Sequence, residues 1–190
     1  MSESLTNLKL VRLGRPVSRP ELEALGERIL EAFVGAVRRI QILDREPPGV
    51  DEIEAPLLTG VLAQDVGGHV LAITDTDLTD AGGPDFFRFM FGCKDNRSDV
   101  AVVSTRRLKS ADPGRSIARL LKVGLHELGH NFGLVHHYGF APADGGGYCP
   151  MTKGDYNRHG ERSYVRSIID GRAAQFCREC RRVLYLAHPW

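Results

Sequence analysis

One segment constrains the fold of this chain more than any other: GLHELGHNFGLVHHYG, residues 124–139. It contains four of the protein's seven histidines. Helical periodicity leads into it from Asp112, a candidate N-cap that Pro113 follows at the first helical position. Apolar residues of this helix cluster on one side at about 100° per residue, and His126 and His130 lie roughly opposite the centre of that stripe. The sequence therefore predicts a long helix that directs two imidazoles away from the hydrophobic core.

The histidine spacing predicts a metal site. His126 and His130 are four residues apart, so their rings project from neighbouring turns of one helix face and can share one ion. Gly133 permits a sharp turn after the helix, because glycine adopts positive φ without a Cβ clash. After that turn His136 can bring a third imidazole to the same ion. Three neutral nitrogen ligands leave one tetrahedral position open for water, which is typical of a catalytic zinc.

Glu127 is the candidate general base. It directly follows the first histidine, and its carboxylate can reach a zinc-bound water without ligating the ion. Zinc lowers the pKa of that water from about 16 to near 7, so the carboxylate can accept the proton and return it to a leaving amine. A solvated, histidine-rich helix face is the competing interpretation. The extended pattern His-Glu-x-x-His-x-x-Gly-x-x-His favours the metal site, because one geometry explains both the glycine and the third histidine.

The cysteines suggest a second metal site. Cys149 and the FCREC pair, Cys177 and Cys180, supply three thiolates, and a closed zinc site needs a fourth ligand. His137 is the preferred fourth ligand. Its rival, Cys93, falls far upstream in the apparent turn FGCKDN, where we expect a small buried thiol. A redox role for the CxxC pair is the alternative, but we expect FCREC to end a helical segment instead of joining a strand to a helix N-terminus.

Strands and helices alternate along the first half of the chain. Strands are expected at 7–13, 38–44 and 69–78, and helices at 19–37 and 51–65. Residues 86–92, FFRFMFG, and 99–105, DVAVVST, have the pattern of two further strands joined by the polar turn CKDNRS. The sequence therefore predicts an α/β (α+β) fold, in which a mostly parallel twisted sheet with an antiparallel edge strand packs on the histidine-bearing helix.

Length and composition limit the classes of function. A chain of 190 residues fits a single domain, 1–190, in which residues 1–133 end with the histidine-bearing helix and residues 134–190 form a smaller C-terminal part. The formal net charge of +1 excludes a dominantly basic nucleic-acid surface and a polybasic membrane face. No apolar run approaches the roughly 20 residues that span a bilayer, and no secretory signal is recognisable. We expect a cytoplasmic monomer with no nucleic-acid or membrane partner.

These segments together resemble the archaemetzincins, a branch of the metzincin zinc metallopeptidases. The resemblance lies in HELGHNFGLVH, in the methionine of YCPM and in the terminal FCREC, with weaker support from LAITDTDL and AVVSTRRL. It implies a metzincin-like fold and a catalytic zinc at His126, His130 and His136, with Glu127 as the base. It also implies a Met-turn at Met151, whose side chain lies beneath the imidazoles, and a structural zinc in a small C-terminal subdomain.

Two departures from the family pattern affect the second metal site. A cysteine usually follows the third histidine ligand in the family, whereas this chain has His137, which changes an all-cysteine site into a Cys3His site. The segment YGFAPADGGGY also lengthens the gap to Cys149. This glycine-rich loop, 138–148, is either a lid beside the cleft or a simple insertion.

The sequence thus predicts a zinc-dependent peptidase that carries two Zn²⁺ ions, one catalytic and one structural, and acts on a peptide or protein substrate. By the same resemblance, the edge strand expected within 86–92 would lie above the cleft, where an extended substrate could pair with it. Two other functions stay open: a zinc-stabilised interaction module with little turnover, and a zinc hydrolase of a non-peptide amide. Glu127 favours catalysis over binding alone, but it does not distinguish peptides from other amides.

Overall fold

The main sheet contains five strands in the computed structural model, which describes residues 6–80, 89–154 and 163–187. Their spatial order is β2 (Val37–Arg45), β1 (Thr6–Leu13), β4 (Val70–Thr74), β7 (Val100–Ser104) and β6 (Gly92–Lys94). The first four are mutually parallel, whereas β6 pairs antiparallel with β7. A separate parallel pair joins β3 (Glu52–Glu54) to β5 (Asp77–Thr79). The predicted fold class, a mostly parallel sheet with an antiparallel edge strand, is confirmed.

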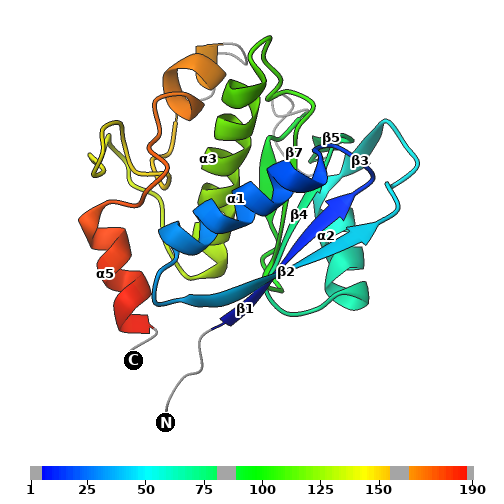
Figure 1. Ribbon diagram of the computed structural model, residues 1–190, viewed down its shortest axis with the longest axis horizontal. Coiled ribbons are helices and arrows are strands. Elements are labelled where there is room, and N and C mark those ends of the chain that lie inside the picture. The colour runs from blue at the N-terminus through cyan, green and yellow to red at the C-terminus, as the bar shows by residue number, and fades with distance from the viewer. Residues whose placement is uncertain (1–5, 81–88, 155–162, 188–190) are drawn as a thin grey trace.

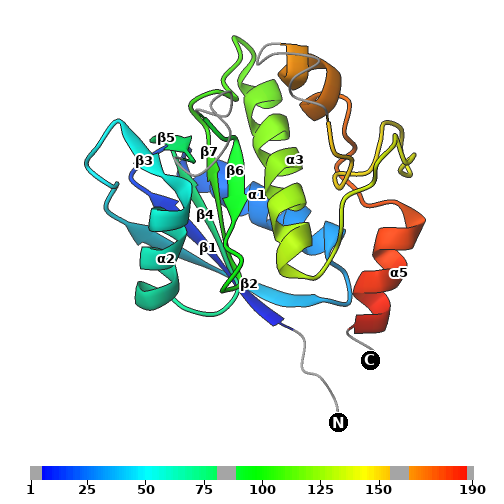
Figure 2. The ribbon, with the colours of Figure 1, turned by 180° about the vertical axis from the view of Figure 1, so that it is seen from behind.

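Helices cover both faces of the main sheet (Figure 1). α1 (Arg19–Ala32) and α3 (Pro113–Asn131) lie on one face, and α2 (Ala55–Asp65) lies on the other (Figure 2). Every residue of β4 and β7 is buried, because both faces of these central strands are covered. One apolar cluster fills the space under α1 and α3, and a second fills the space under α2. No helix among the described residues has the length and hydropathy of a membrane span.

Local sequence signals set the ends of the two helices that support the site. Ser18 and Glu21 form a reciprocal capping box at the start of α1. Asp112 caps α3 as predicted, since its Oδ1 accepts the Gly114 N–H at 2.9 Å. The predicted turn at Gly133 is also present, with φ of +79°. It reverses the chain after α3 and so returns the following residues to the side of the helix.

The chain after α3 folds back along the side of that helix that faces away from the sheet (Figures 1 and 2). It includes a single π-helical turn, η1 (Val165–Ile169), and α5 (Arg178–Ala187). Lys122 of α3 donates to the Asp170 carbonyl oxygen at 2.7 Å, directly after η1. This hydrogen bond attaches the C-terminal part to the predicted metal-binding helix.

The edge strand differs from its sequence-based prediction. A strand was expected within 86–92, but the edge strand β6 begins only at Gly92 and includes Cys93, which was expected in a turn. The turn follows instead at Asp95, whose N–H donates to the Val100 carbonyl at 2.9 Å. Phe86 and Phe87 of the expected strand lie outside the described residues. Hydrogen bonding to β7 sets where β6 begins and which residues it pairs with. The apolar content of residues 86–92 does not predict this pairing.

Two helix boundaries also differ from expectation. Residues Glu52–Glu54 form β3, and α2 begins only at Ala55, with Pro56 in its first turn. FCREC begins α5 and does not end a helix, as we had expected. Its acidic residue, Glu179, lies in the first turn, where a negative charge interacts favourably with the helix dipole. The sequence argument against a redox role for the CxxC pair is therefore wrong. The side chains around the pair must distinguish a redox role from a metal site.

A partly buried ion pair fixes the C-terminal part to α3. The Arg119 guanidinium donates to both carboxylate oxygens of Asp170 at 2.7 and 2.8 Å. It also donates to the carbonyls of Leu108 and Lys109, both at 3.3 Å. The guanidinium hydrogen bonds lower the pKa of the Asp170 carboxyl group. Four acceptors therefore depend on one side chain that is only 10% exposed.

We expect Arg119→Met to lower the free energy of unfolding by about 2–4 kcal/mol, because it leaves the Asp170 carboxylate and two carbonyl groups without their donor. Urea denaturation measures the change. Arg45→Met is the matched control, since the Arg45–Asp65 pair is exposed, at 42% and 54%, and should contribute less than about 1 kcal/mol. Equal losses in the two variants would contradict the assigned role of Arg119.

Candidate metal centres

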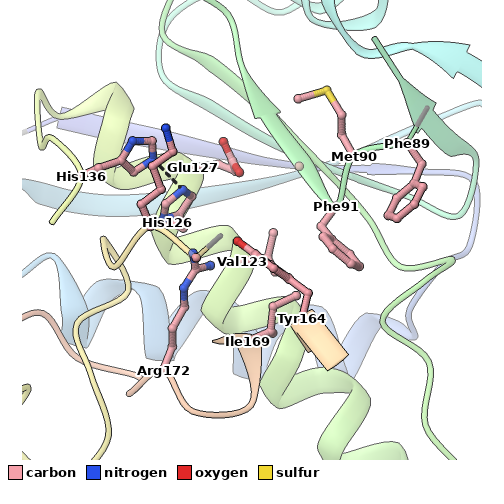
Figure 3. Close-up of a pocket in the computed structure, with 13 residues that line it drawn as sticks. Phe89, Met90, Phe91, Val123, His126, Glu127, His136, Tyr164, Ile169 and Arg172 are labelled. Atoms are coloured by element: carbon pink, nitrogen blue, oxygen red, sulfur yellow. Dashed lines mark hydrogen bonds between the residues drawn. The ribbon is translucent and has the colours of Figure 1, made fainter. Parts of the chain in front are cut away.

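Three imidazoles converge at the C-terminal half of α3. His136 Nε2 lies 3.1 Å from His130 Nε2. It lies 3.2 Å from His126 Nε2 (Figure 3). The Nδ1 atoms face backbone carbonyls, that of His126 at 2.8 Å from Pro150 O and that of His130 at 2.9 Å from Leu134 O. A carbonyl oxygen only accepts, so Nδ1 of both rings carries the proton and Nε2 presents a lone pair. The structure thus brings together the three histidines that the sequence singled out.

These nitrogen atoms fit a shared cation. His136 can give a proton to only one of its two neighbours, so at least one contact would place lone pair against lone pair without a cation. Two nitrogens on a tetrahedral zinc at about 2.0–2.1 Å lie roughly 3.3–3.4 Å apart, close to the observed spacing. Burial lowers the pKa of His126 well below its usual value and that of His136 to about 4. The rings are therefore neutral at physiological pH, as metal ligation requires.

Glu127 lies beside this cluster but outside the group of possible ligands. Its side chain borders the same cavity as His126 and His136, and the residue is only 9% exposed. In the view of Figure 3, the carboxylate lies between the His126 ring and the segment that carries Met90 and Phe91. Burial raises the pKa of Glu127 to about 7, although the charge of Arg172 opposes the shift. A carboxyl group with this pKa can both accept and return a proton near neutral pH.

A cavity of about 300 Å³ opens next to these side chains. Its walls are mainly apolar, and the Phe91 and Tyr164 rings stack at 5.8 Å between centroids. Val123 and Ile169 also line it (Figure 3). A second hollow, of about 500 Å³, adjoins the same imidazoles and is lined by Cys93, among others. The cluster therefore lies where two concave surfaces meet, as a site that acts on a ligand requires.

Arg172 is a buried charge at this site that the sequence did not indicate. It is 4% exposed, and its Nη2 donates to the Thr152 carbonyl at 2.8 Å. Burial lowers its pKa, and interactions with the nearby Tyr164, Glu127 and Cys149 counteract that shift. Its segment, DGRAAQ, matches no motif and has no periodic pattern. Only the folded chain brings this guanidinium between the histidine cluster and a second cluster, which is formed by His137 and three cysteines.

The turn around Met151 packs directly on α3. Met151 is fully buried, and the preceding carbonyl, Pro150 O, is the acceptor for His126 Nδ1. A Cβ atom added at Gly129 would collide with Met151 Sδ. Gly129 lies between the two helix histidines in the sequence, so the missing side chain makes room for the methionine next to them. The turn therefore supports the histidine cluster through two contacts: the Pro150 carbonyl at His126, and the Met151 side chain packed at Gly129.

We expect Gly129→Ala to lower the free energy of unfolding by about 1–3 kcal/mol through this collision, although alanine normally stabilises a helix interior. Gly60→Ala is the matched control, because nothing lies within 4 Å of a Cβ atom at that position in α2. The control should gain about 0.5–1 kcal/mol. Thermal unfolding of both variants gives the comparison, and a stabilised Gly129→Ala variant would refute the close packing of Met151.

A second cluster contains His137 and three cysteines. His137 Nε2 lies 3.2 Å from Cys180 Sγ and 3.3 Å from Cys177 Sγ. Cys149 Sγ lies 3.7 Å from Cys180 Sγ, and all three cysteines of the cluster are unbridged thiols. Four donors within 4.8 Å of one another match the donor set of a closed tetrahedral zinc site. Hydrogen bonding from Cys180 lowers the pKa of the Cys149 thiol, which favours the thiolate form that binds metal.

Cys93, the rival fourth ligand, does not belong to this cluster. It lies on β6 and lines the hollow next to the histidine cluster. It is half-buried, whereas we had expected a small buried thiol. Burial raises its pKa to about 12, so this thiol stays protonated. Of the two candidates for the fourth position, the structure places only His137 beside the three cysteines.

One extended segment serves both clusters. The His137 N–H donates to Met151 O at 3.0 Å, and the Lys153 N–H donates to His137 O at 3.1 Å. In an extended chain successive side chains point to opposite sides. His136 therefore turns toward the first cluster while His137 turns toward the second. The two candidate metal centres share this backbone segment. The position of the ligand in one centre therefore constrains the position of the ligand in the other.

The loop 138–148 forms a small hairpin. Ala143 N–H donates to Gly147 O at 3.1 Å, and Cys149 N–H donates to Ala141 O at 2.8 Å. Gly147 has φ of +81°, and a Cβ atom there would collide with the Gly171 carbonyl oxygen. Neither cavity at the histidine cluster is lined by a residue of this loop among the described residues. These contacts favour a simple insertion over a lid.

The fold and the histidine cluster define a class. A mostly parallel sheet with an antiparallel edge strand, packed on a helix that presents two of three converging imidazoles, is a metzincin-like domain. The chain is 34% identical to the archaemetzincin of Aeropyrum pernix over 124 residues, which is 64% of this chain and 56% of that protein. It is 33% identical to the archaemetzincin of Methanopyrus kandleri over 118 residues, 61% of this chain and 55% of that protein. The matches thus span about half the length of these curated relatives, and no family model matches the chain.

Solved structures extend the likeness over nearly the whole chain. The crystal structure of the Methanopyrus kandleri archaemetzincin superposes with a TM-score of 0.72 and 26% identity, and covers 97% of this chain and 96% of that one. A zinc-dependent peptidase from Methanocorpusculum labreanum, at 22% identity and a TM-score of 0.66, covers 93% of this chain and 99% of its own, and shares the fold. The sequence matches and this structural likeness together support the archaemetzincin family for this chain.

Proposed function

We propose that this protein is a zinc-dependent peptidase that hydrolyses peptide bonds at the cluster of His126, His130 and His136, with Glu127 as general base. One observation carries the proposal: three neutral imidazoles with converging lone pairs border the same hollow, of about 500 Å³, as a buried carboxylate that is not itself in the group of possible ligands. The names of the relatives, archaemetzincin and zinc-dependent peptidase, support the same class of reaction.

The residues of the chain divide the reaction between them. His126, His130 and His136 would hold zinc, which would act there as a Lewis acid, lowering the pKa of water and polarising a carbonyl group. Glu127 accepts a proton from the attacking water and transfers it to the leaving amine. The carbonyls of Pro150 and Leu134 hold the Nδ1–H tautomers of His126 and His130, so that both Nε2 lone pairs stay directed at the ion. An extended substrate pairs with the outer edge of β6, next to the cavity.

We also propose a structural zinc at His137, Cys149, Cys177 and Cys180. Four protein donors would fill the coordination sphere of a tetrahedral zinc and leave no position open for water. This site would therefore hold the C-terminal part together and take no part in hydrolysis. Met151 would form the Met-turn, an apolar support between the two sites, in agreement with its complete burial against α3. In this proposal residues 1–133 and 134–190 form one domain joined through the shared segment at 136–137.

A buried carboxylate in an open cavity favours catalysis over a zinc-stabilised interaction module, because a binding site gains nothing from burying Glu127. A peptide-library digest, read by mass spectrometry with and without a chelator, tests the function. We expect cleavage that the chelator removes and added zinc restores. A library left uncut by the zinc-loaded protein would contradict peptidase activity, and turnover of small amides alone would assign the site to a non-peptide substrate.

A further inference from the structure

At Gly92 the edge strand packs directly against the proposed base. A Cβ atom built there would lie 2.8 Å from Glu127 Cγ and 3.0 Å from Glu127 Oε1. Carbon atoms in proteins do not pack at such distances without displacement. Gly92, Glu127, His126 and His136 line both hollows at the histidine cluster. Gly92 is therefore the point at which the sheet meets the carboxylate between the two concave surfaces.

The backbone at Gly92 does not itself require glycine. Its φ is not among the positive values found at other glycines of the described chain. The strand is also held in place: Gly92 pairs with Val103, and the Ser104 N–H donates to the Phe91 carbonyl at 2.9 Å. The third of the three atoms nearest to such a Cβ is the Val102 carbonyl oxygen, at 3.0 Å. A side chain at this position would therefore press on Glu127, and the carboxylate would be the group that moves.

We propose that Gly92 is a positioning residue for the general base: its missing side chain lets the Glu127 carboxylate lie against the edge strand, at the junction of the two hollows. This inference rests on the proposed peptidase function for its catalytic consequence. The packing itself is independent of that function. A methyl group at position 92 would displace the carboxylate by about 1 Å, because non-bonded carbon atoms pack about 3.5–4.0 Å apart. None of the three atoms nearest to it belongs to a histidine.

A double-mutant cycle in the zinc-loaded protein tests the contact without relying on activity. Gly92→Ala should lower Tm by about 4–8 °C when residue 127 is glutamate. In a Glu127→Ala background, where Cγ is absent, the same substitution should change Tm by less than about 2 °C. The close contact with the Val102 carbonyl oxygen is present in both backgrounds. It therefore cancels in the difference between the two changes in Tm. Gly60→Ala, in open space on α2, is the control and should have the same small effect in both.

Steady-state kinetics tests the catalytic consequence. Gly92→Ala should reduce kcat by about 10²-fold, because a 1 Å misplacement of a catalytic group has effects of that size. It should leave KM within about threefold and the zinc content unchanged, which a general loss of structure would not. An unchanged kcat, or an equal fall in Tm in both backgrounds, would overturn the proposal. If the wild-type chain hydrolyses no peptide, the proposed function fails, while the Tm cycle still decides whether Gly92 positions Glu127.

Discussion

Replacing Glu127 by glutamine will leave zinc bound and reduce kcat for peptide hydrolysis by about 10²–10⁴-fold. Glutamine keeps the length of the side chain and its fit against Gly92, but an amide cannot accept the proton of the attacking water. The three imidazoles that form the ligand set are unchanged, so the metal content stays the same. Initial rates on a cleaved library peptide and metal analysis of the same sample measure the two quantities together.

Glu179→Gln is the matched control for this substitution. Glu179 is exposed in the first turn of α5, so its loss removes the same charge without touching the site. We expect wild-type turnover from this variant. Sustained hydrolysis by Glu127→Gln would mean that another group acts as the base. A parallel loss of zinc would instead make Glu127 a ligand, and either outcome rejects the assigned role.

Removal of the thiol cluster should have the largest effect on stability. The double variant Cys177→Ser, Cys180→Ser should bind one zinc ion per chain instead of two and unfold more than about 10 °C below the wild type. The cluster joins three segments that are far apart in the sequence, around His137, Cys149 and the start of α5. Binding free energy at such a site is folding free energy, because the unfolded chain does not hold the donors together.

The comparison with the histidine cluster makes this prediction specific. His130→Ala should also lower the zinc content to one ion, but with a smaller fall in Tm, because that cluster lies on a helix that the core already supports. Cys93→Ser is the control, since Cys93 lies outside the thiol cluster, and it should keep two ions. A wild-type protein with a single ion, or a thiol variant as stable as the wild type, would contradict the structural site.

Features that depend on nearby residues were predicted from the sequence. Helix α3 was expected from its apolar spacing, its start from Asp112 and Pro113, and its end from Gly133. The convergence of the three histidines follows from helix geometry and one turn. Each of these features involves neighbours within about one or two turns of the chain, where propensity and spacing are informative.

Other features depend on distant neighbours and were not predicted. The register of β6 is set by pairing with β7, and Cys93 and Lys94 are accepted there because an edge strand has an open side. The place of Arg172 between the two clusters depends on the whole C-terminal part. Gly129 did offer a signal, since a glycine inside a long helix is unfavourable and indicates close packing. Gly92 offered none, because its partner is a side chain on another element.

Crystals of the zinc-loaded protein, measured on both sides of the zinc absorption edge, test the central claim most directly. The account predicts an anomalous peak at about 2.0–2.1 Å from Nε2 of His126, His130 and His136, with no fourth protein side chain on that ion. Imidazoles that point apart with no peak between them would contradict the account. So would a fourth side chain that closes the coordination sphere, because it would leave no position for the reacting water.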